Sequence, residues 1–234
     1  DIPCYIADPV SVDEFEDVAR ISGLKELPRR SLVHALNIRK VAYNIAKAHG
    51  KALSEMNMIV AHLGGGISIA SLRGGRIVDV NNANEQGPFS PERAGGLPAV
   101  ALVRLCFAEG STEAEVIKHV TRTGGLVSYL GTNDAREVQR RIDSGDTQAA
   151  LVLEGMAYQI AKEIGAMATV LEGDVDVIVL TGGLANNAAI VGWVIERVGF
   201  IAPVEVVPGE NELEALNDAY LRLKQGVEIE KAYE

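Results

Sequence analysis

The sequence has 234 residues, of which 47% are hydrophobic and 23% are charged, and its formal net charge at pH 7 is −10. This composition is that of a folded globular protein and excludes a disordered chain. The acidic charge argues against a broad contact with nucleic acid, and no apolar run approaches the roughly 18 to 20 residues of a membrane-spanning helix, so we expect neither partner.

The first residues and the cysteines bear on processing and location. The chain opens with Asp1-Ile2-Pro3-Cys4, which has neither an initiator Met nor the pattern of a secretory signal, so we expect a chain that is internally cut or processed. Cys4 and Cys106 lie far apart and form no CxxC pair, which indicates neither a disulfide framework nor a zinc site. A reducing cytoplasm fits this cysteine usage.

The first predicted elements are three strands joined by glycine turns. An apolar run over 58–63 predicts a strand, Gly64-Gly65-Gly66 ends it, and residues 67–70 alternate as a half-buried strand does. The segment 73–76, Arg-Gly-Gly-Arg, predicts a two-residue hairpin turn, since glycine adopts the positive φ that such turns require. A return strand begins at Ile77, so a three-stranded meander is expected.

Helices follow the meander. Pro98 suits the first position of a helix that runs to Phe107. A long helix is predicted over 153–171, where apolar residues recur at three- and four-residue steps. Capping-box spacing predicts two further helix starts, at Thr112 with Glu115 and at Asp134 with Glu137.

The last third of the sequence predicts strands separated by helices. A buried strand over 176–180 ends in Thr181-Gly182-Gly183, a helix surrounds Trp193, and another strand runs over 204–207. A last helix stops near Gly226, and we expect its buried stripe to consist of Leu213, Leu216, Tyr220 and Leu223. An antiparallel start and a helix-separated parallel continuation predict an α/β fold.

The two glycine turns that follow apolar strands are the first candidates for a phosphate site. Glycine lets the backbone come close to a ligand and direct its N–H groups at phosphate oxygens. Each turn also has a simpler interpretation. Gly64 to Gly66 can be a tight hairpin, and Gly182-Gly183 can be a place where a helix and a strand pack closely.

Four segments are more specific in combination than either turn alone: 62–66 (HLGGG), 180–183 (LTGG), 87–98 (GPFSPERAGGLP) and 208–212 (PGENE). The first resembles the second phosphate motif of the acetate and butyrate kinase family. The second resembles the adenosine motif of the actin, hexokinase and sugar-kinase superfamily, to which that family belongs. The last two resemble the butyrate kinase branch, and the resemblance extends from Asp8 to the last helix.

The resemblance implies an actin-like, ribonuclease H-like nucleotide-binding domain in which helices flank a mixed sheet. Residues 1–57 would be the tail of a first such domain. Residues 58–234 would be the second, which holds the nucleotide, with the last helix packing back on the first. The family begins with a strand and an Asn/Ser-rich phosphate loop that we do not find in these residues, so we expect an N-terminal part to be missing.

The resemblance also implies an activity, the transfer of a phosphoryl group between Mg-ATP and a short-chain fatty acid such as butyrate, which gives an acyl phosphate and ADP. Mg²⁺ with ATP or ADP, a short-chain carboxylate and a further copy of the chain are the expected partners. We expect impaired activity if the first domain is missing. The alternatives are another kinase of the superfamily, such as a sugar kinase, a nucleotide-binding module without catalysis, and a structural subunit.

The resemblance assigns catalytic roles to three residues. Arg93 would neutralise charge on the migrating phosphoryl group, or else is a surface or core-lining arginine. His34 would donate a hydrogen bond to a transition-state oxygen, or else is a structural histidine. Asp8 would lie near the carboxylate substrate and the metal, or else starts an Asp-Pro turn. We expect both glycine turns to meet on one side of a cleft into which Arg93 points.

The motifs also imply the residues that bind the nucleotide. His62 would face the phosphates beside Gly64, Gly65 and Gly66, although a histidine in an apolar strand can equally be a buried, hydrogen-bonded residue. The adenosine motif implies nucleotide contacts from Gly182, Gly183, Leu184 and Asn186. His49 and His119 are predicted to face solvent.

Overall fold

The computed structural model describes residues 4–210 and 212–230, and within them it contains a five-stranded sheet of strand order β3-β2-β1-β4-β5. Strands β1, β2 and β3 pair antiparallel, whereas β1, β4 and β5 pair parallel, which confirms the predicted meander and the mixed α/β sheet. The strands are β1 (Asn57–Leu63), β2 (Ile67–Arg73), β3 (Arg76–Val80), β4 (Val177–Gly182) and β5 (Val204–Pro208).

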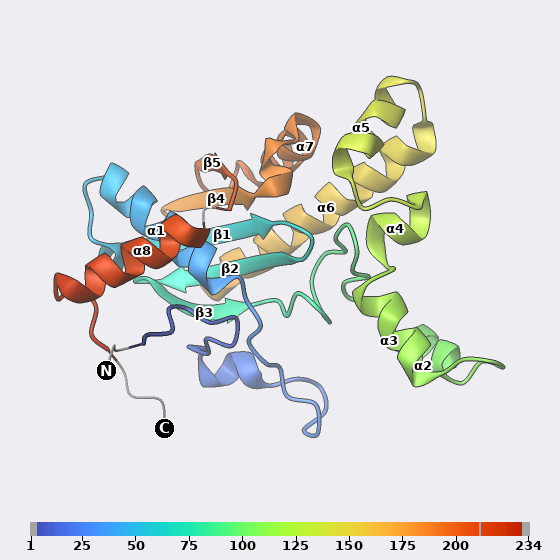
Figure 1. Cartoon of the computed structure of the whole chain (residues 1–234), viewed down its shortest axis with the longest axis horizontal. Coiled ribbons are helices and arrows are strands. Elements are labelled where there is room, and N and C mark those ends of the chain that lie inside the picture. The colour runs from blue at the N-terminus through green and yellow to red at the C-terminus, as the bar shows by residue number, and fades with distance from the viewer. Residues whose placement is uncertain (1–3, 211, 231–234) are drawn as a thin grey trace.

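Helices cover both faces of the sheet, and an arm that begins with α2 extends beyond the end of β1 (Figure 1). The α-helices are α1 (Ala35–Ala48), α2 (Ala99–Cys106), α3 (Glu113–Thr121), α4 (Gly125–Leu130), α5 (Ala135–Asp143), α6 (Thr147–Val170), α7 (Ala188–Val198) and α8 (Glu212–Lys224). Short 3-10 helices are η1 (Asp17–Arg20), η2 (Leu53–Glu55) and η3 (Gly183–Asn186).

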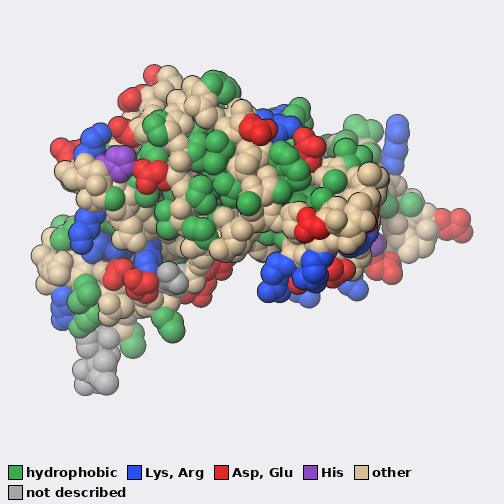
Figure 2. Space-filling view, turned by 90° about the horizontal axis from the view of Figure 1, so that it is seen from above, with side chains coloured by type: hydrophobic (Ala, Val, Ile, Leu, Met, Phe, Trp, Pro, Cys, Tyr) green, Lys and Arg blue, Asp and Glu red, His purple; other side chains and the backbone are tan. Residues whose placement is uncertain are grey.

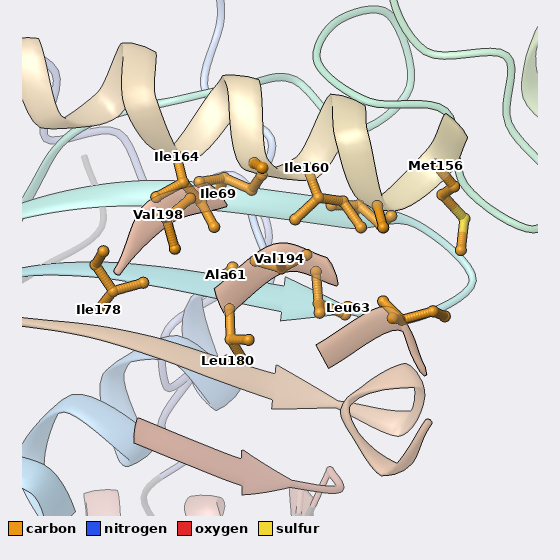
Figure 3. Close-up of a cluster of buried hydrophobic side chains, with 14 of the residues drawn as sticks. Ala61, Leu63, Ile69, Met156, Ile160, Ile164, Ile178, Leu180, Val194 and Val198 are labelled. Carbon is orange, nitrogen blue, oxygen red and sulfur yellow. The ribbon is translucent and has the colours of Figure 1, made fainter. Parts of the chain in front are cut away.

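One apolar core lies between the sheet and helices α6 and α7. Because successive side chains of a strand point to opposite faces, alternate residues of β1 and β4 enter this core. Figure 3 shows it filled by Ala61, Leu63, Ile69, Ile178 and Leu180 from the sheet and by Met156, Ile160, Ile164, Val194 and Val198 from the two helices. The predicted long helix is therefore confirmed, although α6 begins earlier, where the Asp146 side chain accepts a hydrogen bond from the N–H of Ala149.

A second core lies under α1, on the opposite face of the sheet. Ile38, Val41 and Ile45 of α1 pack with Met58, Val60, Val177 and Val179, so β1 and β4 are apolar on both faces. This double burial explains why their sequences read as continuous apolar runs. Residues before 57 thus supply a full core layer, and the domain boundary at residue 57 stays a prediction.

The predicted stripe of the last helix is wrong. Helix α8 buries Ala215 and Ala219, whereas Leu213 is 85% exposed and Leu216 and Tyr220 are exposed as well. The reason is the neighbour: α8 lies along α1, and small alanines at an i, i+4 spacing suit that close contact. An ion pair with 2.7 Å between Lys40 Nζ and Glu214 Oε2 stabilises the same orientation.

The predicted helix starts hold with small differences. Pro98 caps α2 and is not its first residue, and Phe107 follows its last turn. Thr112 and Asp134 are the N-caps of α3 and α5. The backbone donor to Asp134 is Arg136, which replaces the predicted Glu137.

The surface combines acidic, basic and apolar side chains. Seen from above, hydrophobic side chains occupy the middle of the molecule, a dense group of Lys and Arg lies right of centre, and further Lys and Arg lie at the left end among acidic side chains (Figure 2). A protein with a net charge of −10 therefore carries local positive charge on this face. None of the helices in the described part of the chain has both the length and the apolarity needed to cross a bilayer.

Candidate active site

The two glycine turns lie next to each other at the carboxyl edge of the sheet. Strands β1 and β4 are parallel neighbours, with His62 opposite Thr181, so the turns that follow them emerge side by side. Gly182 has a φ of +88°, and a Cβ atom there would lie 2.5 Å from the carbonyl oxygen of Leu63. Glycine at this position lets the two turns touch.

A cavity of about 1100 Å³ opens at this edge. Gly64 and Gly65 line it from the first turn, and Gly183, Leu184 and Asn186 line it from the second. The remaining wall comes from the loop before α2, from α5 and the residues just before it, from the start of α7 and from the segment after β5, through Pro91, Glu92, Asn133, Asp134, Ala135, Arg136, Gln139, Arg140, Asn187, Ala188, Ala189 and Glu210. The volume is that of a site for a small organic ligand.

The glycines of the first turn serve different purposes. A Cβ at Gly66 would lie 2.3 Å from Arg93 Nη1, and one at Gly64 would lie 2.9 Å from Glu210 Oε1, so a side chain at either position would displace a neighbouring side chain. Gly65 is exposed and has open space where a side chain would stand, and the same holds for Gly183. Protein packing therefore does not explain glycine at 65 and 183.

Arg93 lies against the first turn. Its guanidinium covers Gly66 and donates from Nη1 to the carbonyl oxygen of Ala83 at 3.3 Å. Burial lowers the pKa of Arg93 below its ordinary value, and the neighbouring Glu92 opposes the decrease. An arginine keeps its charge under such shifts, so a permanent positive charge stands beside the glycine turn.

His34 and His62 stack face to face, with His62 beside Gly64 and 4.0 Å between the ring centroids. Atom Nδ1 of His34 lies 2.8 Å from the Ser68 hydroxyl. His62 is held at both nitrogens, with Nδ1 at 3.0 Å from Asn37 Oδ1 and Nε2 at 3.2 Å from Glu210 Oε1. The rings are therefore fixed by the start of α1, the start of β2 and the segment after β5.

The environment of the stack sets its charge. Burial, together with the positive charges of His62 and Arg93, lowers the pKa of His34 to about 4, against a smaller opposite effect of Glu210. The hydrogen bond from His62 is the largest cause of a lowered pKa for Glu210. At neutral pH the site thus contains a neutral His34, an ionised Glu210 and a cationic Arg93.

Asp8 lies apart from this group. Its Oδ1 accepts from Arg39 Nε at 3.0 Å, and the same guanidinium binds Glu14 and the carbonyl oxygen of Gly75, in the hairpin at the far end of β2. Burial raises the pKa of Asp8, and Arg39 opposes the increase. The structure does not bring Asp8 to the cavity, and its catalytic and metal-binding roles stay predictions.

Several contributors were not predicted. Glu210 and Ser90 stand inside segments whose family resemblance was noted, and Asn37 follows His34 by three residues, yet nothing in their residue type separated them from turn formers. Asn211, in the segment 208–212, lies outside the described residues. For the residues of α5 that line the cavity, the sequence predicted only the start of a helix. His49 and His119 are exposed, as predicted.

Comparisons with known proteins identify the fold and then the family. The structure matches crystal structures of an acetate kinase from Porphyromonas gingivalis (TM-score 0.82, 24% identity, 92% of this chain and 63% of that one) and a propionate kinase from Francisella tularensis (TM-score 0.77, 21% identity, 86% and 60%). Likeness at this identity shows the fold alone, an actin-like mixed sheet flanked by helices. The model of the acetokinase family matches residues 24–215, so the chain belongs to that family.

Similar sequences lie in the butyrate kinase branch. The chain is 57% identical to a protein named probable butyrate kinase 2 from Caldanaerobacter subterraneus subsp. tengcongensis and 48% identical to butyrate kinase 2 from Clostridium acetobutylicum. Both matches cover 99% of this chain, but only 66% and 65% of the respective relatives. The chain therefore spans about two thirds of the length of the relatives that it matches.

Proposed function

We propose that the protein is a carboxylate kinase that transfers a phosphoryl group between ATP and a short-chain fatty acid, with butyrate as the first acid to test. The observation that carries the proposal is the contact of two glycine turns at one edge of the sheet, with Arg93 lying on the first of them. The names of the relatives, which are butyrate, acetate and propionate kinases, support the choice of substrate class.

In this reaction a carboxylate oxygen attacks the γ-phosphorus of ATP in line. The new bond to phosphorus forms as the bond to the β-phosphate oxygen breaks, which gives an acyl phosphate and ADP. Both reactants are anionic, so positioning and charge neutralisation supply most of the catalysis. Arg93 supplies a fixed positive charge, and glycine N–H groups hold phosphate oxygens.

His34 contributes a neutral hydrogen-bond donor. In the tautomer in which the Ser68 hydroxyl donates to Nδ1, the neutral ring carries its proton on Nε2 and can donate it to a phosphoryl oxygen. A neutral donor stabilises charge there without attracting the substrate carboxylate as strongly as a cation would. His62 is held by Asn37 and Glu210, and it stacks on the His34 ring and so fixes the position of that ring.

The magnesium ion would come with the nucleotide. Among the described residues, no group of three or more His, Cys, Asp and Glu side chains is arranged to hold a metal ion. This fits Mg²⁺, which takes phosphate oxygens and waters plus one or two carboxylates. Glu92 and Glu210 line the cavity and could contribute, whereas Asp134 is engaged by Arg136. When bound, the ion neutralises phosphate charge.

Three further features belong to the proposal. The division into a first-domain tail over 1–57 and a nucleotide domain over 58–234 follows the family resemblance. So does the assembly into a homo-oligomer. A cytoplasmic location follows the cysteine usage.

The glycines without packing constraints test the nucleotide site. Gly65→Ala and Gly183→Ala add a methyl group where the protein leaves space, so both variants should fold normally and bind ADP about tenfold or more weakly in calorimetry. Gly155→Ala, in the middle of α6 and also without close neighbours, is the matched control and should bind like the wild type. Unchanged affinity in both test variants would contradict the nucleotide site.

A coupled assay with the protein at its full natural length tests the reaction itself. ATP-dependent formation of an acyl phosphate from butyrate is the expected result. ADP binding without turnover of any short-chain acid would favour a binding module, and turnover of a sugar would favour another kinase of the superfamily. Either result would replace the proposed function.

A further inference from the structure

Ser90 connects the two parts of the site that would contact the phosphoryl group. Its side chain is buried, with 1% of the residue exposed. The hydroxyl donates to the carbonyl oxygen of Gly65 at 2.6 Å and accepts from the N–H of Arg93 at 3.1 Å. The Ser90 N–H also donates to the Arg93 carbonyl at 3.0 Å, so residues 90–93 close into a compact turn.

The hydroxyl fixes the glycine turn as well as the arginine turn. In a trans peptide the carbonyl and the following N–H lie in one plane and point in opposite directions. A bond to the Gly65 carbonyl therefore fixes the direction of the Gly66 N–H. Gly66 is also the residue on which the guanidinium lies. One serine thus sets a backbone donor of the phosphate turn and the loop that carries Arg93.

The other side of this loop is held by the start of α4. The N–H of Leu126 donates to the Ser90 carbonyl at 3.3 Å, and the N–H of Val127 donates to the Pro91 carbonyl at 3.1 Å. Gly125 has a φ of +57°, and a Cβ there would lie 1.7 Å from the Ser90 carbonyl oxygen. The loop over residues 90–93 is therefore held by α4 on one side and by the Ser90 hydroxyl on the side that contacts the glycine turn.

We infer that Ser90 is a positioning residue for phosphoryl transfer, which holds the Arg93 guanidinium in register with the Gly64 to Gly66 turn. The inference rests on the proposed function, because it acts through Arg93. Loss of the hydroxyl leaves the Gly65 carbonyl without this donor and lets the two turns shift relative to each other. A misplacement of about 1 Å at a reacting centre can cost about a hundredfold in rate.

Ser71 provides a matched control. It is also buried, with 0% exposed, and its hydroxyl also donates to a backbone carbonyl, that of Met167, at 2.9 Å. It stands in the middle of β2, away from the cavity. Ser71→Ala therefore removes an equivalent buried hydrogen bond and should cost similar stability without touching the site.

The test is steady-state kinetics of butyrate phosphorylation by the protein at its full natural length. Ser90→Ala should lower kcat about 10- to 100-fold and change KM for ATP less than about threefold, whereas Ser71→Ala should keep the wild-type kcat. In an Arg93→Ala background, Ser90→Ala should lower kcat by a smaller factor than in the wild type, because one of the two groups that it positions is gone. If Ser90→Ala does not fold, Ser90→Cys keeps the volume with a weaker donor and should lower kcat in the same direction.

The outcomes separate this inference from the proposed function. If Arg93→Ala keeps wild-type turnover, the proposed role of Arg93 is wrong and the inference falls with it. If Arg93→Ala loses turnover while Ser90→Ala keeps the wild-type kcat, only the inference is overturned. If Ser90→Ala lowers kcat in the Arg93→Ala background by the same factor as in the wild type, the inference is overturned too.

Discussion

The predicted site residues at the carboxyl edge of the sheet lie close together, whereas Asp8, in the N-terminal segment, lies apart from them. At the edge, residues far apart in sequence come into contact, as Gly66 does with Arg93 and His34 does with His62. In the N-terminal segment, Asp8 is engaged by the partly buried guanidinium of Arg39. The difference teaches that a residue is placed reliably by a motif whose neighbours constrain it, and less reliably by a single matching side chain.

The largest expected effect is on the first side of this comparison. Arg93→Ala in the protein at its full natural length should lower kcat about a thousandfold or more, because a permanent charge beside the transferring group is lost. The KM for ATP should change far less, since other groups hold the nucleotide. Steady-state kinetics measure both, and Arg104→Ala on the exposed arm is a control. Equal kcat values for Arg93→Ala and the wild type would remove Arg93 from the site.

The second prediction concerns the Asp8 side. If the Asp8–Arg39 pair is structural, a double-mutant cycle with Asp8→Ala and Arg39→Ala should give a coupling free energy of about 2 kcal/mol in urea unfolding, as partly buried ion pairs do. A coupling near zero, together with loss of turnover in Asp8→Asn, would instead support the predicted catalytic role of Asp8.

The third prediction uses the lowered pKa of His34. An unfolded histidine takes up its proton near pH 6.5, whereas the folded ring does so only near pH 4, so the unfolded state binds more protons between these values and stability falls as the pH drops. From pH 7 to pH 5 this should cost about 2 kcal/mol of unfolding free energy. His34→Gln should remove that share of the pH dependence.

The readout of this experiment is the difference between the two pH values. A packing loss in His34→Gln shifts the unfolding free energy at pH 7 and at pH 5 alike, so it cancels in the difference. An identical difference in the variant and the wild type would show that His34 is not the group that resists protonation.

The smallest expected effect concerns α8. Leu213 is exposed, so Leu213→Ser should change the unfolding free energy of the chain by no more than about 0.5 kcal/mol. Ala215 lies against α1, so Ala215→Leu should cost about 1 to 3 kcal/mol through overpacking. Denaturant unfolding compares the two, and the reverse order would restore the predicted leucine stripe.

The sequence was informative where local chemistry has few solutions. Strands buried on both faces need continuous apolar runs, and the hairpin at Gly74-Gly75 needs positive φ, so the sheet could be predicted in outline. The stripe of α8 could not, because periodicity alone does not show whether leucines or alanines face the neighbour. Which side of α8 is buried depends on its tertiary contact with α1.

The candidate site divides in the same way. Gly64 to Gly66 and Gly182-Gly183 could be found, because glycine after a buried strand is a strong local signal. The contact of Glu210 with His62 could not, since these residues are far apart in sequence and meet only after β5 pairs with β4. The residues of α5 that line the cavity were not predicted as site residues for the same reason.

The central claim is that the edge formed by the two glycine turns binds nucleotide phosphates. The most direct measurement is a titration of the isotope-labelled chain with ADP, in which the amide resonances of Gly65, Gly183 and Gly155 are followed by NMR. We predict that Gly65 and Gly183 shift together with one saturation curve while Gly155 does not move. A saturable shift elsewhere in the protein, with Gly65 and Gly183 unmoved, would contradict the account.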